Sequence, residues 1–321
     1  MHQLRLKIEN EALLCCPICG SDLELQPSGV NCADPACAQV FPVVDGVPIL
    51  INEARSIFSI DDFAQRRDTF FKSSGRTRTQ QSLKQLLPQI SRNLKARHNY
   101  RRLADLLLAG SDRPRVLIIG GSILGKGMEA LASHAQLDLV ETDVALGPRT
   151  MLVCDAHDLP FKDGSFDAAI AQAVMEHVAD PYRCAEEIHR VLKDDGYVYA
   201  ESPLVAPVHA GRYDFTRFTH LGHRRLFRRF EEIDSGVVCG PGTALASTYE
   251  SFLLSFGRAR YLRWSAKAFA RLTAFWLKYL DPYLSEKPGA LDAAAGCYFL
   301  GRKSRDVLSD RELIKQYRGA L

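Results

Sequence analysis

Apolar residues in the middle of the chain form short continuous runs, and segments with helical spacing of apolar residues lie between some of them. Uninterrupted apolar runs of this length are typical of strands buried on both faces of a parallel sheet. Residues 181–193 repeat apolar side chains every three or four positions and are predicted to form a helix. The runs lie at residues 115–119, 137–141, 151–154, 166–171 and 197–200. This alternation predicts an α/β fold with helices covering a parallel sheet.

The overall composition is typical of a soluble globular protein, with 46% hydrophobic and 25% charged residues among 321. A net charge of +3 is too small to indicate nucleic-acid binding by itself. No uncharged apolar run approaches the roughly 18 residues that a membrane span requires. The first residues, MHQLRLKIENEALLCCP, lack the apolar segment of a signal peptide. We therefore expect a cytoplasmic protein.

Five of the nine cysteines lie before residue 40, which indicates a metal site more than disulfides. Cys16 and Cys19 form one knuckle, and Cys32 and Cys37 form a second one, with twelve residues between the two knuckles. Four thiolates can converge on one Zn²⁺, which would be structural because no coordination position stays open. Cys15 could compete with Cys16 as a ligand. The alternative is a metal-free fragment that keeps the shape.

The segment that follows the knuckles, FPVVDGVPILI, continues the same pattern. Residues 12–51 resemble the small zinc-ribbon activator subunit of tRNA and release-factor methyltransferases, and the related free-standing bacterial ribbons. The second knuckle departs from that family, because four residues instead of two separate its cysteines. The resemblance implies that a partner protein could dock through the ribbon.

The most informative stretch runs from Asp155 to Gly196, DAHDLPFKDGSFDAAIAQAVMEHVADPYRCAEEIHRVLKDDG. It resembles class I S-adenosylmethionine-dependent methyltransferases of the type 11 subgroup in its LPF, SFD, EHV-x-DP and RVLK elements. The resemblance implies a Rossmann-like sheet of seven strands and S-adenosyl-L-methionine as the cofactor.

The first predicted strand leads into a glycine-rich loop, GGSILGKG, and then into a helix. Glycines there let the backbone approach the amino-acid end of a cofactor. The loop supplies the expected cofactor contacts Gly120, Gly121, Ser122 and Gly125. The family usually has an acid two residues before the first glycine, and this chain has Ile118 instead.

The resemblance assigns the remaining cofactor contacts. Asp143 would bind the ribose hydroxyls, with Glu141 as a nearby rival, and Asp155 and the Ala156 amide would bind the adenine. Gln172 would lie on the floor of the cleft near the sulfonium. Only twelve positions separate Asp143 from Asp155, so the helix usually found between these two strands must be reduced or missing.

We expect residues 205–220 to form a lid at the carboxyl ends of the strands, where open α/β sheets bind ligands. His209 and Tyr213 are the candidate catalytic residues, because they could orient an acceptor and take a proton from a hydroxyl. His177 is expected to pack and to form hydrogen bonds. The alternative is a lid whose polar groups satisfy only one another.

Two segments carry basic residues. Residues 53–113 hold thirteen Lys or Arg against six acids, an excess of seven, which we interpret as a solvated helical face. A helical insertion at about 247–284 places basic side chains on one face and apolar ones on the other. We expect it to pack on its own domain, so contact with a membrane or with RNA is not favoured. The apolar face would consist of Ala268, Phe269, Leu272, Phe275, Trp276, Tyr279 and Leu280.

These observations divide the chain into four parts. They are a zinc-ribbon-like domain (1–52), a basic helical linker with a cofactor-covering helix (53–112), a methyltransferase domain (113–304) and a C-terminal tail (305–321). The leading hypothesis is O-methylation of a small-molecule or sugar acceptor. Methylation of RNA or protein is an alternative, although AQAV stands where an Asn/Asp-Pro-Pro-Tyr signature would lie. A non-catalytic scaffold that binds the cofactor is the third hypothesis.

Overall fold

The computed structural model describes the whole chain except residues 1–3, 7, 27–28, 68, 70–86 and 321. Seven strands form the central sheet in the order β7-β6-β5-β8-β9-β11-β10, and only β11 runs antiparallel to its neighbours. The expected Rossmann-like sheet of seven strands is therefore confirmed. The strands are β5 (Arg115–Ile119), β6 (Asp138–Asp143), β7 (Leu152–Cys154), β8 (Phe166–Gln172), β9 (Leu192–Pro203), β10 (Phe230–Cys239) and β11 (Gly296–Lys303).

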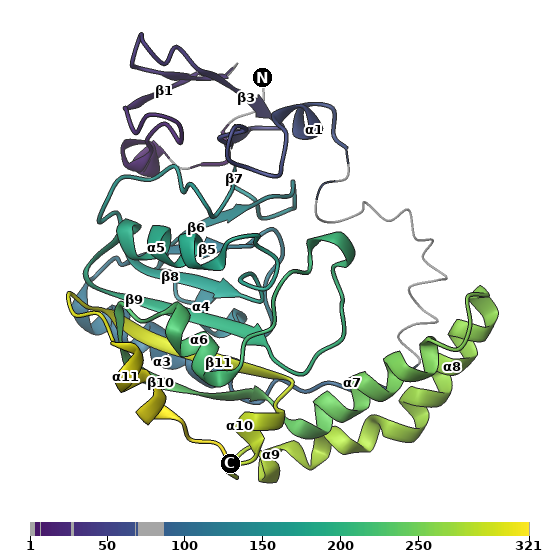
Figure 1. Cartoon of the computed structure of the whole chain (residues 1–321). Coiled ribbons are helices and arrows are strands. Elements are labelled where there is room, and N and C mark those ends of the chain that lie inside the picture. Colours follow the sequence, from purple (N-terminus) through teal and green to yellow (C-terminus); the bar gives the residue numbers. More distant parts are fainter. Residues whose placement is uncertain (1–3, 7, 27–28, 68, 70–86, 321) are drawn as a thin grey trace.

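Helices cover both faces of this sheet (Figure 1). Leu117 and Ala169 point into one core with α5 (Pro181–Val191) and α6 (His220–Leu226). The neighbouring Val116 and Ala168 point into a second core with α3 (Ala96–Gly110) and α4 (Glu129–Ala132). Because successive residues of a strand face opposite sides, burial of both faces requires the continuous apolar runs.

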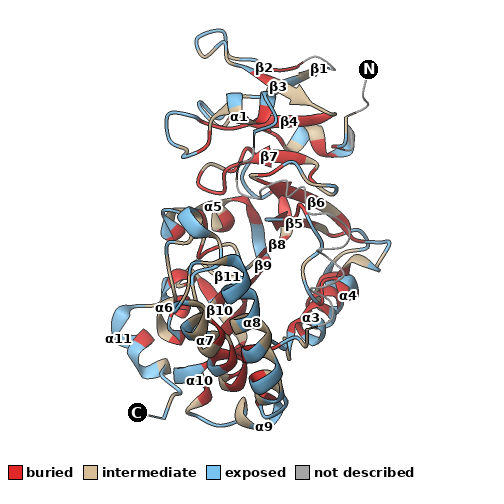
Figure 2. Ribbon diagram, turned by 90° about the vertical axis from the view of Figure 1, so that its right-hand side faces the viewer, coloured by how far each residue is buried: buried red, intermediate tan, exposed pale blue. Residues whose placement is uncertain are grey.

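The ribbon adds four strands to the same sheet: β1 (Leu23–Gln26), β2 (Gly29–Cys32), β3 (Val40–Val44) and β4 (Val47–Leu50). β4 pairs in parallel with β7, with Ile49 opposite Val153 and Leu50 opposite Cys154. Ribbon residues also share the main core with Leu117 and Val140. Figure 2 shows buried residues running through this junction. The ribbon is thus an extension of the central sheet and shares its core.

No helix lies between β6 and β7, as the short spacing predicts. The chain after the ribbon covers that part of the sheet instead. Phe58 and Phe63, the latter in α1 (Ile60–Ala64), pack with Ile49 and Val153 in a small core of their own. A segment from the region predicted as a linker therefore takes the place of the missing helix. The stretch 70–86 of that linker lies outside the described residues.

The insertion between β10 and β11 begins earlier than predicted, at Pro241 instead of about residue 247. Gly240 and Pro241 start α7 (Pro241–Leu254), and α8 (Arg260–Ala274) packs beside it in an arm that projects from the sheet (Figure 1). The other elements are η3 (Phe275–Tyr279), α9 (Asp281–Leu284) and α10 (Ala290–Ala293).

The amphipathic pattern of the arm does not predict which of its faces is buried. The apolar face is largely exposed: Phe269 is 56% exposed, Leu272 60% and Trp276 51%. Two basic side chains of α8, Lys267 and Arg271, instead pair with Glu250 of α7 within the same arm, at 3.3 and 2.7 Å. Only Ala270 and Ala274 of α8 are buried. None of the described helices is long and apolar enough to cross a membrane.

The region predicted as a tail is structured. Ser309 and Glu312 form a capping box at α11 (Asp310–Leu313), which is followed by η4 (Ile314–Gln316). Leu313 is buried, and Arg318 lies 2.8 Å from the His220 ring. Capping together with one buried leucine explains why so short a segment is ordered.

His223 in α6 gives the fold a defined response to acid. Its ring is 2% exposed and packs edge-on against Phe227. Burial lowers the pKa of His223 to about 3, and the neighbouring His220 is a smaller cause. Since this pKa lies below the ordinary 6.5 for histidine, the unfolded chain binds more protons at acid pH. The stabilising effect of the neutral ring is present above pH 6.5 and is lost as the pH falls.

We therefore expect the free energy of unfolding to fall by up to about 1.4 kcal/mol per pH unit between roughly pH 6 and pH 4. Urea unfolding at a series of pH values measures this slope. A His223→Leu variant should lack the part of this slope that His223 contributes. Equal slopes in the two proteins would contradict the assignment.

Candidate functional site

A cleft lies where strands β5 to β8 end at their carboxyl edge. It encloses about 660 Å³ of space outside the protein atoms, part of it open to solvent. Its lining residues are Ile57, Phe58, Ile119, Gly120, Thr142, Asp143, Val144, Cys154, Asp155, Ala156, His157, Ala173, Val174, His177 and Val178. The cleft therefore combines apolar walls with two carboxylates on neighbouring strands, which is the usual composition of a small-molecule site.

Asp143 closes strand β6 and is only 5% exposed. The Ser122 amide donates a hydrogen bond of 2.9 Å to its carboxylate. Burial raises the pKa of Asp143, and the donors from Ser122 and nearby amides oppose that shift. Its rival Glu141 is absent from the cleft lining and instead pairs with Arg149 at 2.6 Å. The geometry thus favours Asp143 as the carboxylate available to a ligand.

Asp155 stands just after β7 and is held by two partners. One carboxylate oxygen lies 2.5 Å from the Ser56 hydroxyl, and the other lies 2.5 Å from Nδ1 of His157. Although burial acts to raise the pKa of Asp155, the hydrogen bonds from His157 and Ser56 hold it below its usual value. A carboxylate offers about four acceptor positions, so an amino group of a ligand still finds one free.

His157 was not singled out by sequence reasoning, yet it fixes the Asp155 loop. Its Nε2 accepts the Asp180 amide at 3.0 Å, so in the neutral ring Nδ1 carries the proton and donates to Asp155. Asp180 in turn caps α5 by accepting the Arg183 amide. The only local sign of this role in the sequence is that His157 lies two residues after Asp155.

The glycine-rich loop approaches the end of β8 closely. Gly120 has φ +75°, and a Cβ there would lie 2.7 Å from a Val174 methyl group. A side chain at Gly125 would overlap the Gln172 amide oxygen. Glycine is favoured at Gly120 because its backbone is left-handed, whereas a side chain at Gly125 would require the Gln172 amide to move.

Of the predicted cofactor contacts, Gly120, Asp143, Asp155 and Ala156 line the cleft. Gln172 does not: its amide nitrogen donates to the Lys126 carbonyl and to Glu201, both at 3.0 Å. Gly121, Ser122 and Gly125 also lie in the loop and outside the lining. Ile118, which replaces the usual acid, is buried in the core on the α3 side of the sheet.

Three residues from the segment after the ribbon join the site. Ile57 and Phe58 line the cleft, and Ser56 holds Asp155. Sequence reasoning missed them because they precede the matched block by about a hundred residues, and only the pairing of β4 with β7 brings them there. The ribbon thereby positions one wall of the cleft.

The lid, residues 205–220, contacts two residues that line the cleft, Phe58 and His177. The Tyr213 ring stacks on Phe58 with centroids 5.7 Å apart, and its hydroxyl accepts from Arg212 at 2.8 Å. His209 is 48% exposed at its side chain and lies 3.0 Å from His177, ring nitrogen to ring nitrogen. His177 forms a hydrogen bond with the Tyr213 carbonyl, in keeping with its expected packing role. The two candidate catalytic residues therefore each contact a residue that lines the cleft.

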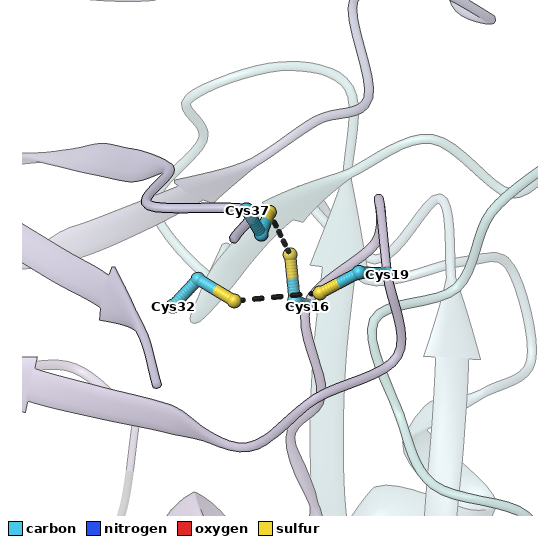
Figure 3. Close-up of side chains that lie close together, drawn as sticks. All are labelled: Cys16, Cys19, Cys32 and Cys37. Carbon is cyan, nitrogen blue, oxygen red and sulfur yellow. Dashed lines mark hydrogen bonds between the residues drawn. The ribbon is translucent and has the colours of Figure 1, made fainter. Parts of the chain in front are cut away.

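The four predicted metal ligands also converge. Figure 3 shows the side chains of Cys16, Cys19, Cys32 and Cys37 turned toward one another. All four sulfur atoms lie within 4.8 Å of each other. Zinc–sulfur bonds of about 2.3 Å in a tetrahedron place sulfurs about 3.8 Å apart, so the donor set fits one Zn²⁺. Cys15 is buried outside this group.

The longer second knuckle is accommodated by a turn at Asp34. The Asp34 carbonyl accepts the amides of Cys37 and Ala38 at 3.1 and 2.9 Å, and its carboxylate accepts the Ala36 amide at 2.8 Å. Ala38 then takes a left-handed φ of 46°. The two extra residues are absorbed by this turn, so Cys37 still reaches the other three thiols.

Comparisons with known proteins agree with this geometry. Residues 121–200 match the family described as "Methyltransferase domain". An uncharacterized methyltransferase of Mycolicibacterium gilvum is 31% identical over 118 residues, which is 36% of this chain and 43% of that protein. A Mus musculus protein named arginine-hydroxylase NDUFAF5, mitochondrial, is 36% identical over 66 residues, 21% of this chain and 18% of that protein. The chain thus spans less than half the length of these curated relatives.

Among solved structures, a Haemonchus contortus phosphoethanolamine N-methyltransferase 2 in complex with S-adenosyl-L-methionine is similar at 14% identity and a TM-score of 0.40. The match covers 65% of this chain and 53% of that one. The strand order, the matched family and the motif block agree. Residues 121–200 therefore belong to a methyltransferase domain, as expected from the sequence.

Proposed function

We propose that this protein transfers the methyl group of S-adenosylmethionine to an oxygen atom of a small-molecule or sugar acceptor. The observation that carries the proposal is a cleft with two buried carboxylates at the ends of neighbouring strands and a lid rich in ionisable side chains at its mouth. The bound cofactor would supply an electrophilic methyl group, so the protein's main task is alignment of the acceptor.

The cleft residues fit such a cofactor. Asp143 would accept hydrogen bonds from the ribose hydroxyls, and Asp155 with the Ala156 amide would bind the adenine edge. Ile57, Phe58 and Val174 supply apolar surface for the ring. Burial of both carboxylates strengthens their hydrogen bonds to a ligand, because water competes less.

The acceptor would lie between the cleft and the lid. Tyr213 contacts the cleft wall through Phe58, so a lid that closes on an acceptor also touches the cofactor side. His209 is exposed enough to meet a hydroxyl and to remove its proton or orient its lone pair. These features support a hydroxyl acceptor that is small enough to lie under the lid.

We also propose a structural zinc ion at Cys16, Cys19, Cys32 and Cys37, where the donor set leaves no open position for chemistry. Its role is to keep the ribbon folded and β4 paired with β7, so that Ser56 and Phe58 stay at the cleft. Docking of a partner protein through the ribbon remains a prediction.

The proposal is tested by incubating the full chain with S-adenosylmethionine labelled on the methyl group and a panel of hydroxylated small molecules and nucleotide sugars. Transfer RNA and a protein extract serve as parallel acceptors. We expect label in the small-molecule fraction and reduced turnover in His209→Asn and Tyr213→Phe. Label confined to RNA or protein would replace this function with the alternative one. Cofactor binding without transfer to any acceptor would favour a scaffold.

A further inference from the structure

A second group of metal-ligand atoms lies where the end of β8 meets the lid. Glu176 and His177 follow β8 by a few residues, and His209 comes from the lid. One carboxylate oxygen and two imidazole nitrogens lie within 4.8 Å of one another. This Glu-His-His group is separate from the cysteines, and the roles assigned above to the cofactor contacts do not use Glu176.

The hydrogen bonds of the two histidines determine where their lone pairs lie. Nδ1 of His177 is 2.8 Å from the Tyr213 carbonyl oxygen. A carbonyl only accepts, so this Nδ1 carries the proton, and in the neutral ring Nε2 is left with a lone pair. Nδ1 of His209 is 3.4 Å from the Pro207 carbonyl and 3.4 Å from the Asp214 carboxylate, both of which are acceptors. The same reasoning leaves its Nε2 with a lone pair.

These lone pairs face each other and a carboxylate. The two Nε2 atoms are 3.0 Å apart, and the Glu176 carboxylate lies 3.7 Å from one and 3.9 Å from the other. Glu176 is 1% exposed, and within the described part of the chain neither of its carboxylate oxygens has a hydrogen-bond partner. One carboxylate oxygen and two imidazole nitrogens therefore converge around a buried carboxylate, an arrangement that a cation between them would stabilise.

We propose that Glu176, His177 and His209 bind a divalent first-row transition cation. Metal–ligand bonds of about 2.1 Å at angles near 90–110° separate ligand atoms by about 3.0–3.4 Å. The observed separations of 3.0 to 3.9 Å need only a small inward shift of the carboxylate or the lid. Imidazole with carboxylate suits cations of the Mn²⁺ to Zn²⁺ series, and three protein ligands leave a position open.

Partners outside the ligand group support the same assignment. Metal-bound histidines usually donate their second nitrogen to a carbonyl or a carboxylate, as both histidines do here. The Glu176 carbonyl accepts the amides of Phe215 and Thr216 at 2.8 and 3.2 Å, which ties the lid to the ligand position. Asp214 is held by Arg217, so its carboxylate is positioned and its charge is balanced.

The chemical role of this cation rests on the proposed methyl transfer, although its binding does not. His177 also lines the cleft, so a bound cation would lie close to the place proposed for the acceptor hydroxyl. A divalent cation that binds a hydroxyl oxygen lowers its pKa and holds it in place for attack. His209 would then act as a ligand, and the lid would close by completing the metal site.

The test uses Co²⁺ as the probe and the full chain with its cysteine group already loaded with zinc. Calorimetry measures Co²⁺ affinity, and visible absorption distinguishes nitrogen and oxygen ligands from thiolates. We expect one Co²⁺ per chain with a spectrum free of thiolate bands. Glu176→Gln and His209→Asn should each weaken binding at least about tenfold. His98→Asn, on an exposed residue of α3, is the matched control and should bind as the wild type does.

Three outcomes would overturn the proposal. They are no uptake of Co²⁺ beyond the cysteines, equal affinity in the ligand variants, or a thiolate spectrum for the added ion. The first of these would mean that only a shared proton joins the three acceptors. Calorimetry with S-adenosylmethionine on the same samples reports the cofactor site separately. If the protein binds the cofactor but not Co²⁺, only the metal site is refuted. If it binds Co²⁺ but not the cofactor, only the proposed function is refuted.

Discussion

Replacing Asp155 by asparagine is expected to lower the affinity for S-adenosylmethionine by about 10- to 100-fold while the protein stays folded. The asparagine oxygen can still accept from His157, and its amide nitrogen can donate to the Ser56 hydroxyl, so the local contacts survive. That amide nitrogen would then face the amino group of adenine, donor against donor. Loss of one charged hydrogen bond is worth about 1.5–3 kcal/mol, and calorimetry with the cofactor measures the change.

An analogue of the cofactor sharpens this experiment. If adenine is replaced by hypoxanthine, the ring presents an oxygen where the amino group was. The Asp155→Asn variant should then bind the analogue better than the wild type does, because its amide can donate to that oxygen. Asp105→Asn, on the exposed side of α3, is the control and should change neither affinity. If Asp155→Asn binds both cofactors as the wild type does, Asp155 does not contact the base.

Replacing Cys32 by serine is expected to have the second large effect, because it removes one of four zinc ligands. Structural zinc contributes folding free energy directly. The ribbon shares its core with the central sheet, so its loss also exposes Leu50, Leu117 and Val140. We expect the midpoint of thermal unfolding to fall by about 10 °C or more. Cofactor affinity should fall with it, since Ser56 and Phe58 lose their support.

Cys15→Ser is the matched control for this variant. Cys15 is buried and lies next to a ligand in sequence, but its sulfur is outside the converging group. It should keep a full complement of zinc by elemental analysis and lose only a little stability. Full zinc and unchanged unfolding in Cys32→Ser would show that Cys32 is not a zinc ligand, whereas loss of zinc with unchanged unfolding would show that the ribbon needs no metal. Loss of zinc in both variants would reassign the ligand to the Cys15 position.

The strands of the central sheet were predictable because a strand that is buried on both faces must consist almost entirely of apolar residues. Residues 115–119 and 166–171 could be nothing but buried strands or short buried helices, and their order in the chain decided between the two. The strand predicted at 197–200 is in fact longer, Leu192–Pro203. Lys193 to Asp195, which follow its first residue Leu192, are polar and exposed, so hydrophobicity gives no sign that they belong to the strand.

The remaining features of the fold and of the candidate site depend on contacts between segments that are distant in the sequence. Phe58 has an ordinary sequence environment, and nothing local shows that it forms a wall of the cleft. The arm formed by α7 and α8 has a clear amphipathic pattern, yet that pattern alone does not show which face is buried. A single acid of α7, Glu250, pairs with two basic side chains of α8. The convergence of Glu176 with His209 likewise follows only from the path of the lid.

The parallel pairing of β4 with β7 also sets an order of events during synthesis. Ile49 and its partner Val153 are 104 residues apart, the difference between their numbers. At about 5–20 residues per second, a ribosome needs roughly 5–20 s to make the intervening chain. Throughout that interval the apolar strand VPIL of the ribbon has an open edge in the nascent protein. An unpaired apolar edge is a template for wrong strand pairing, so the yield of correctly assembled protein should depend on how fast the ribosome reaches β7.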